Sequence, residues 1–181
     1  MNEKALKQAS KFLSLVLRHQ PELIGLRMDE NGWVDVDQLI SKAAAQGMTY
    51  TPELIAQLVR ESDKQRFALS RDGERIRANQ GHSVEVDLGY QPTEPPGILF
   101  HGTAARNWPS IQEQGLLKGE RHHVHLSAER ETALKVGQRH GTAVVLVVDS
   151  ARMHHEGFVF FRSTNGVWLT DAVPAPYVSQ E

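Results

Sequence analysis

A segment rich in proline and glycine divides the 181-residue chain into two halves, and this division limits the fold more than any other feature. The segment runs from Asn79 to Gly97, where a continuous helix or strand is unfavourable. About 90 residues on either side are enough for one small domain each. We therefore predict two lobes, residues 1–90 and residues 91–181. The turn-forming residues are Gly81, Gly89, Pro92, Pro95, Pro96 and Gly97.

The first half has the pattern of three helices and a hairpin. Apolar residues recur every three or four positions over residues 6–17, as in an amphipathic helix. Two further helices are predicted to begin near Asp35 and after Thr51, which can act as N-cap. Asp72-Gly73 then marks the turn of a hairpin over residues 66–78. This order is typical of a winged-helix lobe that binds nucleic acid, although a wing that only supports packing fits the pattern equally well.

Short strands dominate the second half. A strand over residues 98–100 leads into His101-Gly102-Thr103, and the apolar run over residues 143–148 predicts a buried central strand. Asn165-Gly166 marks a second hairpin. Within the crossing, alternation over residues 84–88 predicts one more strand. The expected fold class is α+β, without the glycine motif of a Rossmann nucleotide site.

Composition excludes several classes of protein. The absence of cysteine removes disulfides, thiolate nucleophiles and zinc sites built on sulfur. No apolar run is long enough for a membrane span and no signal peptide is recognisable, so a cytoplasmic protein is expected. A net charge of −2 argues against a broad footprint on duplex nucleic acid, while a local phosphate site stays possible.

Histidine clusters in the second half, where seven of the nine lie between His101 and His155. A metal site is the first interpretation, but no HExxH or similar spacing accompanies the cluster, so no metal is expected.

The segment from Arg121 to Ser127 alternates in a way that suggests a polar pocket. Read as a strand, it points Arg121, His123, His125 and Ser127 to one face. Burial of such a face is costly unless an anion lies against it, and phosphate suits a guanidinium. An edge strand whose polar face meets water is the simpler alternative. For Ser127, N-capping of a following helix is an equal alternative to ligand binding.

Several short motifs in this order resemble the RNA 2′-phosphotransferase family, whose members remove an internal 2′-phosphate from RNA, including tRNA, with NAD+ as acceptor. The similarity covers nearly the whole chain. The motifs are Leu15-Val16-Leu17-Arg18-His19 before Pro21, Gly32-Trp33-Val34, Lys64-Gln65-Arg66-Phe67, Gln80-Gly81-His82-Ser83, His101-Gly102-Thr103 and the run from Arg121 to Ser127.

The resemblance implies an N-terminal winged-helix lobe packed on a C-terminal ADP-ribosyltransferase-like lobe. The family's Arg-His-Arg-Arg catalytic set falls on Arg18, His19, Arg66 and Arg121, so both lobes contribute to the expected site. For Arg18 and His19 the alternative from the residues alone is compensation of the helix dipole. By the same resemblance, NAD+ would be bound by His101, Gly102, Thr103 and Ser127.

The reaction implied by the family begins when the 2′-phosphate attacks C1″ of the nicotinamide ribose and expels nicotinamide. The ribose O2″ of the ADP-ribosylated 2′-phospho-RNA then attacks phosphorus. The products are RNA with a 2′-hydroxyl, ADP-ribose 1″,2″-cyclic phosphate and nicotinamide. NAD+ is thus consumed as a substrate, and an attacking group that is already anionic needs no general base.

Two other functions fit parts of the sequence. A mono-ADP-ribosyltransferase acting on protein usually needs a carboxylate that the polar run at residues 121–127 lacks, whereas transfer to a nucleic-acid end could coexist with dephosphorylation. A DNA-binding regulator that senses NAD+ is disfavoured by the near-neutral charge. The expected partners are NAD+ and RNA bearing an internal 2′-phosphate, for a protein that is a monomer and has no membrane anchor.

Overall fold

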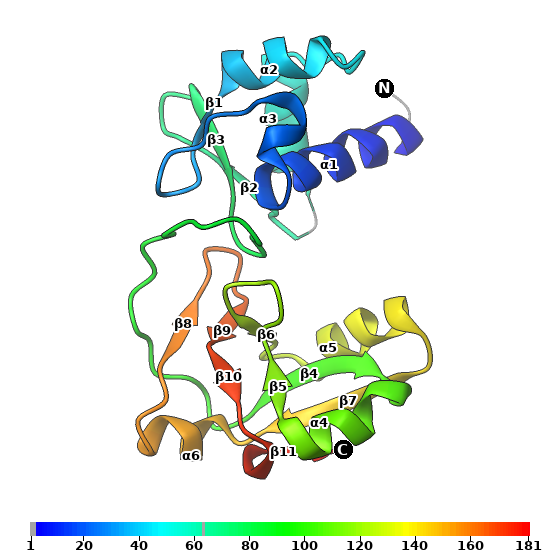
Figure 1. Cartoon of the computed structure of the whole chain (residues 1–181), viewed down its shortest axis with the longest axis vertical. Helices are drawn as coiled ribbons and strands as arrows, with labels where there is room; N and C mark the ends of the chain where they lie inside the picture. Colours follow the sequence, from blue (N-terminus) through cyan, green and yellow to red (C-terminus); the bar gives the residue numbers. More distant parts are fainter. Residues whose placement is uncertain (1–2, 63) are drawn as a thin grey trace. The chain divides into compact units, whose positions relative to one another are not determined.

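The computed structural model describes residues 3–62 and 64–181, which form two compact units. Unit 1 ends at Gly89 and unit 2 is Tyr90–Glu181. Helices and small antiparallel sheets are mixed in both units (Figure 1), which confirms the α+β class. Within the described part of the chain, no helix combines the length and the apolar character needed to cross a membrane.

Unit 1 consists of three helices and a three-stranded antiparallel sheet. The strand order is β1-β3-β2, and the β2–β3 hairpin turns at Gly73, whose φ is 76°. The elements are α1 (Glu3–Arg18), the 3-10 turn η1 (Pro21–Ile24), β1 (Val34–Asp35), α2 (Val36–Ala44), α3 (Pro52–Arg60), β2 (Phe67–Leu69) and β3 (Arg75–Ala78).

Side-chain caps fix where α2 and α3 begin, and the cap at Thr51 was predicted. The Asp35 side chain accepts the Gln38 N–H at 2.8 Å, and the Thr51 hydroxyl accepts the Leu54 N–H at 3.2 Å. Each helix buries an apolar face in one core, where α1 contacts β3, α2 contacts β1 and α3 contacts β2. The largest fully buried side chains of this core are Leu13, Leu17, Leu39, Ile55, Phe67 and Ile76.

Unit 2 contains three small antiparallel sheets with the orders β11-β7-β4, β6-β9-β8 and β10-β5. The predicted central strand is confirmed as β7, and the hairpin at Asn165-Gly166 joins β8 to β9. The elements are β4 (Leu99–Ala104), η2 (Ala105–Asn107), α4 (Trp108–Gln114), β5 (Leu116–Leu117), β6 (Val124–Leu126), α5 (Arg130–Gly137), η3 (Gln138–His140), β7 (Ala143–Val148), α6 (Ser150–His155), β8 (Phe160–Arg162), β9 (Trp168–Thr170), β10 (Ala172–Val173), η4 (Ala175–Tyr177) and β11 (Val178–Gln180).

Two strand predictions were wrong, one because the strand is absent and the other because the strand is longer than expected. Residues 84–88 form no strand; the amides of Ser83 and Val84 donate instead to the Arg18 carbonyl at the end of α1. The strand expected at residues 98–100 continues to Ala104 as β4. It continues because β4 pairs with β7 along its whole length, which provides hydrogen-bond partners for the polar residues that follow the apolar start.

Helix α5 packs directly on β4, as Figure 1 shows, and Gly102 is the point of closest approach. A Cβ added to Gly102 would lie 1.6 Å from the Ala133 carbonyl oxygen and 2.9 Å from the Gly137 nitrogen. Only a residue without a side chain fits there. The packing of α5 is therefore a sufficient reason for glycine between His101 and Thr103.

Candidate functional site

In unit 1, the structure brings Arg18 and Arg66 together. Arg18 is the last residue of α1, and Arg66 directly precedes β2, 48 positions later. The Arg18 guanidinium donates through Nη2 to the Arg66 carbonyl at 3.4 Å, so this contact fixes one side chain against the other residue's backbone. Both side chains are half-buried. The two arginines expected to bind phosphate therefore lie next to each other in unit 1.

His19 lies beside them and is oriented by a hydroxyl group. Its Nδ1 is 2.9 Å from Oγ of Ser83, and the Ser83 amide donates to the Arg18 carbonyl at 2.8 Å. Ser83 therefore holds both the ring of His19 and the end of α1. This contact fixes the orientation of the imidazole, a group that can exchange a proton near neutral pH.

Backbone constraints fix the chain just before Arg66. Gln65 is the non-glycine residue with positive φ in the described part of the chain, at 41°, a conformation that is costly for an L side chain. The buried Asn79 stabilises it, because its side-chain amide donates to the Gln65 carbonyl while its backbone amide donates to the Arg66 carbonyl at 2.9 Å.

In unit 2, His125 connects two predicted site residues. Its carbonyl accepts a hydrogen bond from Nδ1 of His101 at 3.0 Å, and its own Nδ1 lies 3.4 Å from Nη1 of Arg121. A guanidinium can only donate, so the His125 Nδ1 accepts. The residue expected to face phosphate and the residue expected to face NAD+ therefore share one neighbour.

The environment of His101 favours its neutral form. Burial lowers its pKa from the ordinary value of 6.5, and the positive charges of Arg121 and His140 lower it further, whereas the bond to the His125 carbonyl acts in the opposite direction. Since Nδ1 must carry the proton that this carbonyl accepts, the neutral ring has a free lone pair on Nε2. His101 can therefore accept a hydrogen bond from a ligand hydroxyl.

The run from Arg121 to Ser127 is only partly the strand that its alternation predicts. The strand β6 begins at Val124, and residues 121–123 form bends. His123 packs its ring edge-on against Phe161, with 5.5 Å between centroids, and Phe161 lies in register with His125 across β9, on the same face of the sheet. Burial lowers the pKa of His123, helped by the nearby charges of His122 and Lys118. Arg121 nevertheless reaches the polar face of β6 through its contact with His125.

The N-cap interpretation of Ser127 was wrong. The backbone N–H and C=O of Ser127 both pair with Phe100, at 2.8 Å each, and α5 begins only at Arg130 with Glu129 as N-cap. This pairing draws Ser127 to the neighbouring strand β4, away from the helix. Its side chain is half-buried next to the start of the His101-Gly102-Thr103 motif.

Sequence reasoning missed the residues that hold the predicted ones in place. Asn107 donates to the hydroxyl of the buried Thr103 at 3.0 Å, Ser83 contacts the ring of His19, and Asn79 donates to the Gln65 carbonyl. Ser83 lies in Gln80-Gly81-His82-Ser83, one of the motifs that carry the family resemblance, but no spacing rule indicates Asn79 or Asn107. Among the residues that the structure describes, no group of three or more His, Asp or Glu side chains could hold a metal ion.

The chain is similar in sequence to a known family of RNA 2′-phosphotransferases. The chain matches the family model described as "RNA 2'-phosphotransferase, Tpt1 / KptA family" over residues 4–172, which is most of its length. Among curated proteins named "Probable RNA 2'-phosphotransferase", one from Agrobacterium fabrum is 58% identical over 170 residues, covering 94% of this chain and 91% of the relative. One from Pseudomonas aeruginosa is 52% identical over 181 residues, covering 99% and 100%.

These matches define a class of phosphotransferases, and they confirm the resemblance found in the motifs. The chain belongs to the RNA 2′-phosphotransferase, Tpt1 / KptA family. The expected catalytic residues Arg18, His19, Arg66 and Arg121 all lie within the matched range.

Proposed function

We propose that this protein is an NAD+-dependent RNA 2′-phosphotransferase. It removes an internal 2′-phosphate from RNA through an ADP-ribosylated 2′-phospho-RNA intermediate and yields 2′-hydroxyl RNA, ADP-ribose 1″,2″-cyclic phosphate and nicotinamide. Family membership supports the activity. The observation that carries the proposal is the gathering of Arg18, His19 and Arg66 at one end of α1, because a phosphate dianion needs several convergent cationic donors.

In unit 1, the arginines bind the 2′-phosphate and His19 acts as an acid. Arg18 and Arg66 offer forked donors, and each charge-assisted bond contributes about 1.5–3 kcal/mol when water is excluded. His19, held by Ser83 through Nδ1, donates a proton from Nε2 to the departing 2′-oxygen of the RNA. The first step requires no base, because the attacking phosphate is already anionic. In the second step, the proton lost by the ribose O2″ as it attacks phosphorus balances the proton gained by the RNA 2′-oxygen.

In unit 2, Arg121 stabilises charge that develops on the phosphoryl oxygens during transfer. His125 supports this role by holding the Arg121 guanidinium at Nη1. Arginine is suited to this position better than lysine, because its planar fork contacts two oxygens together.

The residues expected to bind NAD+ suit hydroxyl and amide groups. His101 offers a lone pair on Nε2 to a ribose hydroxyl, and Thr103 keeps its O–H as a donor while its oxygen accepts from Asn107. Ser127 lies across from Phe100, next to His101, and would contact the nicotinamide side. NAD+ supplies the ribose carbon that receives the phosphate.

The lobe assignments are part of the same proposal. The order α1, α2, α3 and then the β2–β3 hairpin in unit 1 supports a winged-helix lobe. The small antiparallel sheets of unit 2, with His101-Gly102-Thr103 on β4, support an ADP-ribosyltransferase-like lobe.

The test is incubation of the whole chain with NAD+ and an oligoribonucleotide bearing one internal 2′-phosphate, in buffer containing a metal chelator. We expect one nicotinamide released for each phosphate removed, together with the cyclic phosphate. Phosphate removal without NAD+, or a strict need for added divalent metal, would contradict the proposal.

A further inference from the structure

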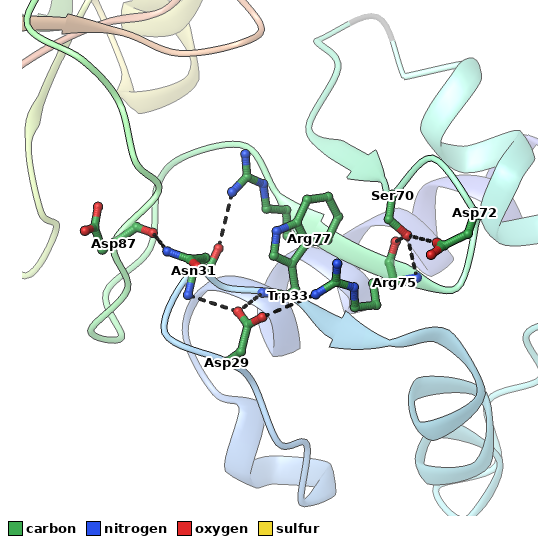
Figure 2. A network of polar contacts seen from close by, with 8 residues as sticks. All are labelled: Asp29, Asn31, Trp33, Ser70, Asp72, Arg75, Arg77 and Asp87. Atoms are coloured by element: carbon green, nitrogen blue, oxygen red, sulfur yellow. Dashed lines mark hydrogen bonds and ion pairs between the residues drawn. The ribbon is translucent and has the colours of Figure 1, made fainter.

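An aromatic and cationic cluster covers the outer face of the β1-β3-β2 sheet in unit 1. On β3, Arg75 and Arg77 alternate with Ile76 and Ala78, which are buried in the core. The guanidinium carbons of Arg75 and Arg77 lie 5.5 Å and 4.6 Å from the ring centroid of Trp33. Figure 2 draws the three side chains together. Trp33 therefore presents its ring to the arginines on the side of the sheet away from the helices.

The two arginines differ in how their charge is balanced. Arg75 has Asp29 at 3.7 Å, and Asp29 also accepts the backbone N–H groups of Asn31 and Trp33 (Figure 2). Arg77 takes part in no ion pair among the described residues. Its Nη1 donates to the Asn31 carbonyl at 3.4 Å, and its Nε is shielded from water without a hydrogen-bond partner. A half-buried cation without a carboxylate is electrostatically complementary to an anionic ligand.

This face continues to a residue of the proposed phosphate site. Arg77 pairs across the hairpin with Ala68, and the alternation of β2 places Arg66 on the same side as Ala68 and opposite the buried Phe67. Arg66 lies two positions before Ala68, about 7 Å along the strand. The cations of Arg66, Arg77 and Arg75 thus follow one side of the sheet.

We propose that the outer face formed by Trp33, Arg75 and Arg77 binds the RNA strand next to the 2′-phosphorylated nucleotide. The arginines contact phosphodiester oxygens, and Trp33 positions the guanidinium plane of Arg77. This inference rests on the proposed function, since Arg66 is taken to bind the 2′-phosphate. RNA is the occupant because two guanidinium groups, one of them without a carboxylate partner, lie along one line beside an aromatic ring, a combination that suits a single strand.

The test compares Arg77→Gln and Arg77→Lys with the parental chain. Arg152→Gln is the matched control, because Arg152 lies 4.8 Å from the Tyr177 ring in unit 2 but pairs with Glu156. Binding of a fluorescent single-stranded RNA of about ten nucleotides, without 2′-phosphate, is measured by anisotropy over a series of salt concentrations. Turnover is measured on a 2′-phosphorylated RNA of the same length and on a 2′-phosphorylated dinucleotide.

We expect Arg77→Gln to weaken RNA binding about tenfold and to reduce the slope of log K against log salt by about 0.7, the value for one lost phosphate contact. Arg77→Lys should keep most of the slope, and Arg152→Gln should bind as the parental chain does. The preference in kcat/KM for the longer substrate over the dinucleotide should fall in Arg77→Gln. Thermal unfolding of each variant shows whether a loss comes from misfolding, and Arg75→Gln then serves as the second variant.

Unchanged RNA affinity and salt slope in Arg77→Gln, or an equal loss on both substrates, would overturn the inference. Binding of an acidic peptide in place of RNA would also overturn it. If the parental chain removes no phosphate from either substrate, the proposed function fails, and the anisotropy titration still tests this face independently.

Discussion

The arginines of unit 1 and Arg121 of unit 2 are held by different kinds of contact. In unit 1, the Arg18 side chain and the Ser83 and Asn79 amides all bind backbone carbonyls, so the arrangement follows from where α1 ends and β2 begins. In unit 2, Arg121 depends on one side-chain contact with His125, in a segment that precedes the strand. We therefore expect single side-chain substitutions in unit 1 to have small effects, because backbone contacts keep the site residues in place. In unit 2, loss of one side-chain contact should have a large effect.

The largest effect is expected at the packing contact of unit 2. Gly102→Ala would force a Cβ against the Ala133 carbonyl oxygen, and because both groups are backbone, relief requires α5 to move. We expect a loss of at least about 3 kcal/mol in the free energy of unfolding. Chemical denaturation measures it. Gly97→Ala is the control in the same unit, because nothing lies within 4 Å of its added Cβ, and an equal loss there would refute the packing argument.

The second largest effect is expected on the rate of the chemical step when Arg121 is replaced. Arg121→Ala should lower the single-turnover rate on 2′-phosphorylated RNA about a hundredfold, on the order of 3 kcal/mol, with little change in RNA affinity, because its contact forms in the transition state. Arg18→Ala should weaken RNA binding as well, since Arg18 docks the phosphate in the ground state. Quenched-flow kinetics and anisotropy separate the two.

Arg60→Ala, on an exposed arginine at the end of α3, controls for charge. An Arg121→Ala protein that loses only affinity, or reacts at the parental rate, would remove the distinction between the units.

Local sequence signals predicted the secondary structure of both units better than they predicted the contacts between distant residues. In unit 1, the helix start near Asp35, the cap at Thr51 and the hairpin at Asp72-Gly73 are local signals, and they were confirmed. The contact between Arg18 and Arg66 spans 48 positions and depends on tertiary packing, so no periodicity could reveal it.

In unit 2, alternation over residues 121–127 predicted a strand with one polar face, but pairing with β9 covers only residues 124–126, and residues 121–123 form bends. The role of Gly102 was expected to be an approach to the dinucleotide. Its closest neighbour in the structure is α5, which lies 31 positions further along the chain at Ala133 and leaves no local sequence signal. Packing between distant segments therefore limited the prediction in both units.

A third effect tests whether single side-chain substitutions in unit 1 have small effects. Ser83→Ala removes the hydroxyl that contacts Nδ1 of His19 but keeps the backbone amide that binds the Arg18 carbonyl. We expect kcat to fall about fivefold, the effect of one lost hydrogen bond of about 1 kcal/mol, with KM for RNA unchanged. Steady-state kinetics measures it, and Ser110→Ala, on an exposed serine of α4, is the control. A drop as large as that of Arg121→Ala would show that unit 1 is as sensitive to single substitutions as unit 2.

The smallest expected effect is a loss of stability at mildly acidic pH through His101. Burial lowers the pKa of His101 below 6.5, so at mildly acidic pH the unfolded chain takes up a proton that folded His101 does not bind. The free energy of unfolding should therefore be highest above pH 6.5 and should decline as the pH falls through the folded-state pKa of His101. His101→Asn should flatten this decline, whereas His154→Asn, on an exposed residue of α6, should leave it. Urea denaturation at about pH 7.5 and about pH 5.5, on either side of the ordinary histidine pKa, measures the difference. An identical decline in His101→Asn and the parental chain would show that His101 is not the group that makes unit 2 sensitive to acid.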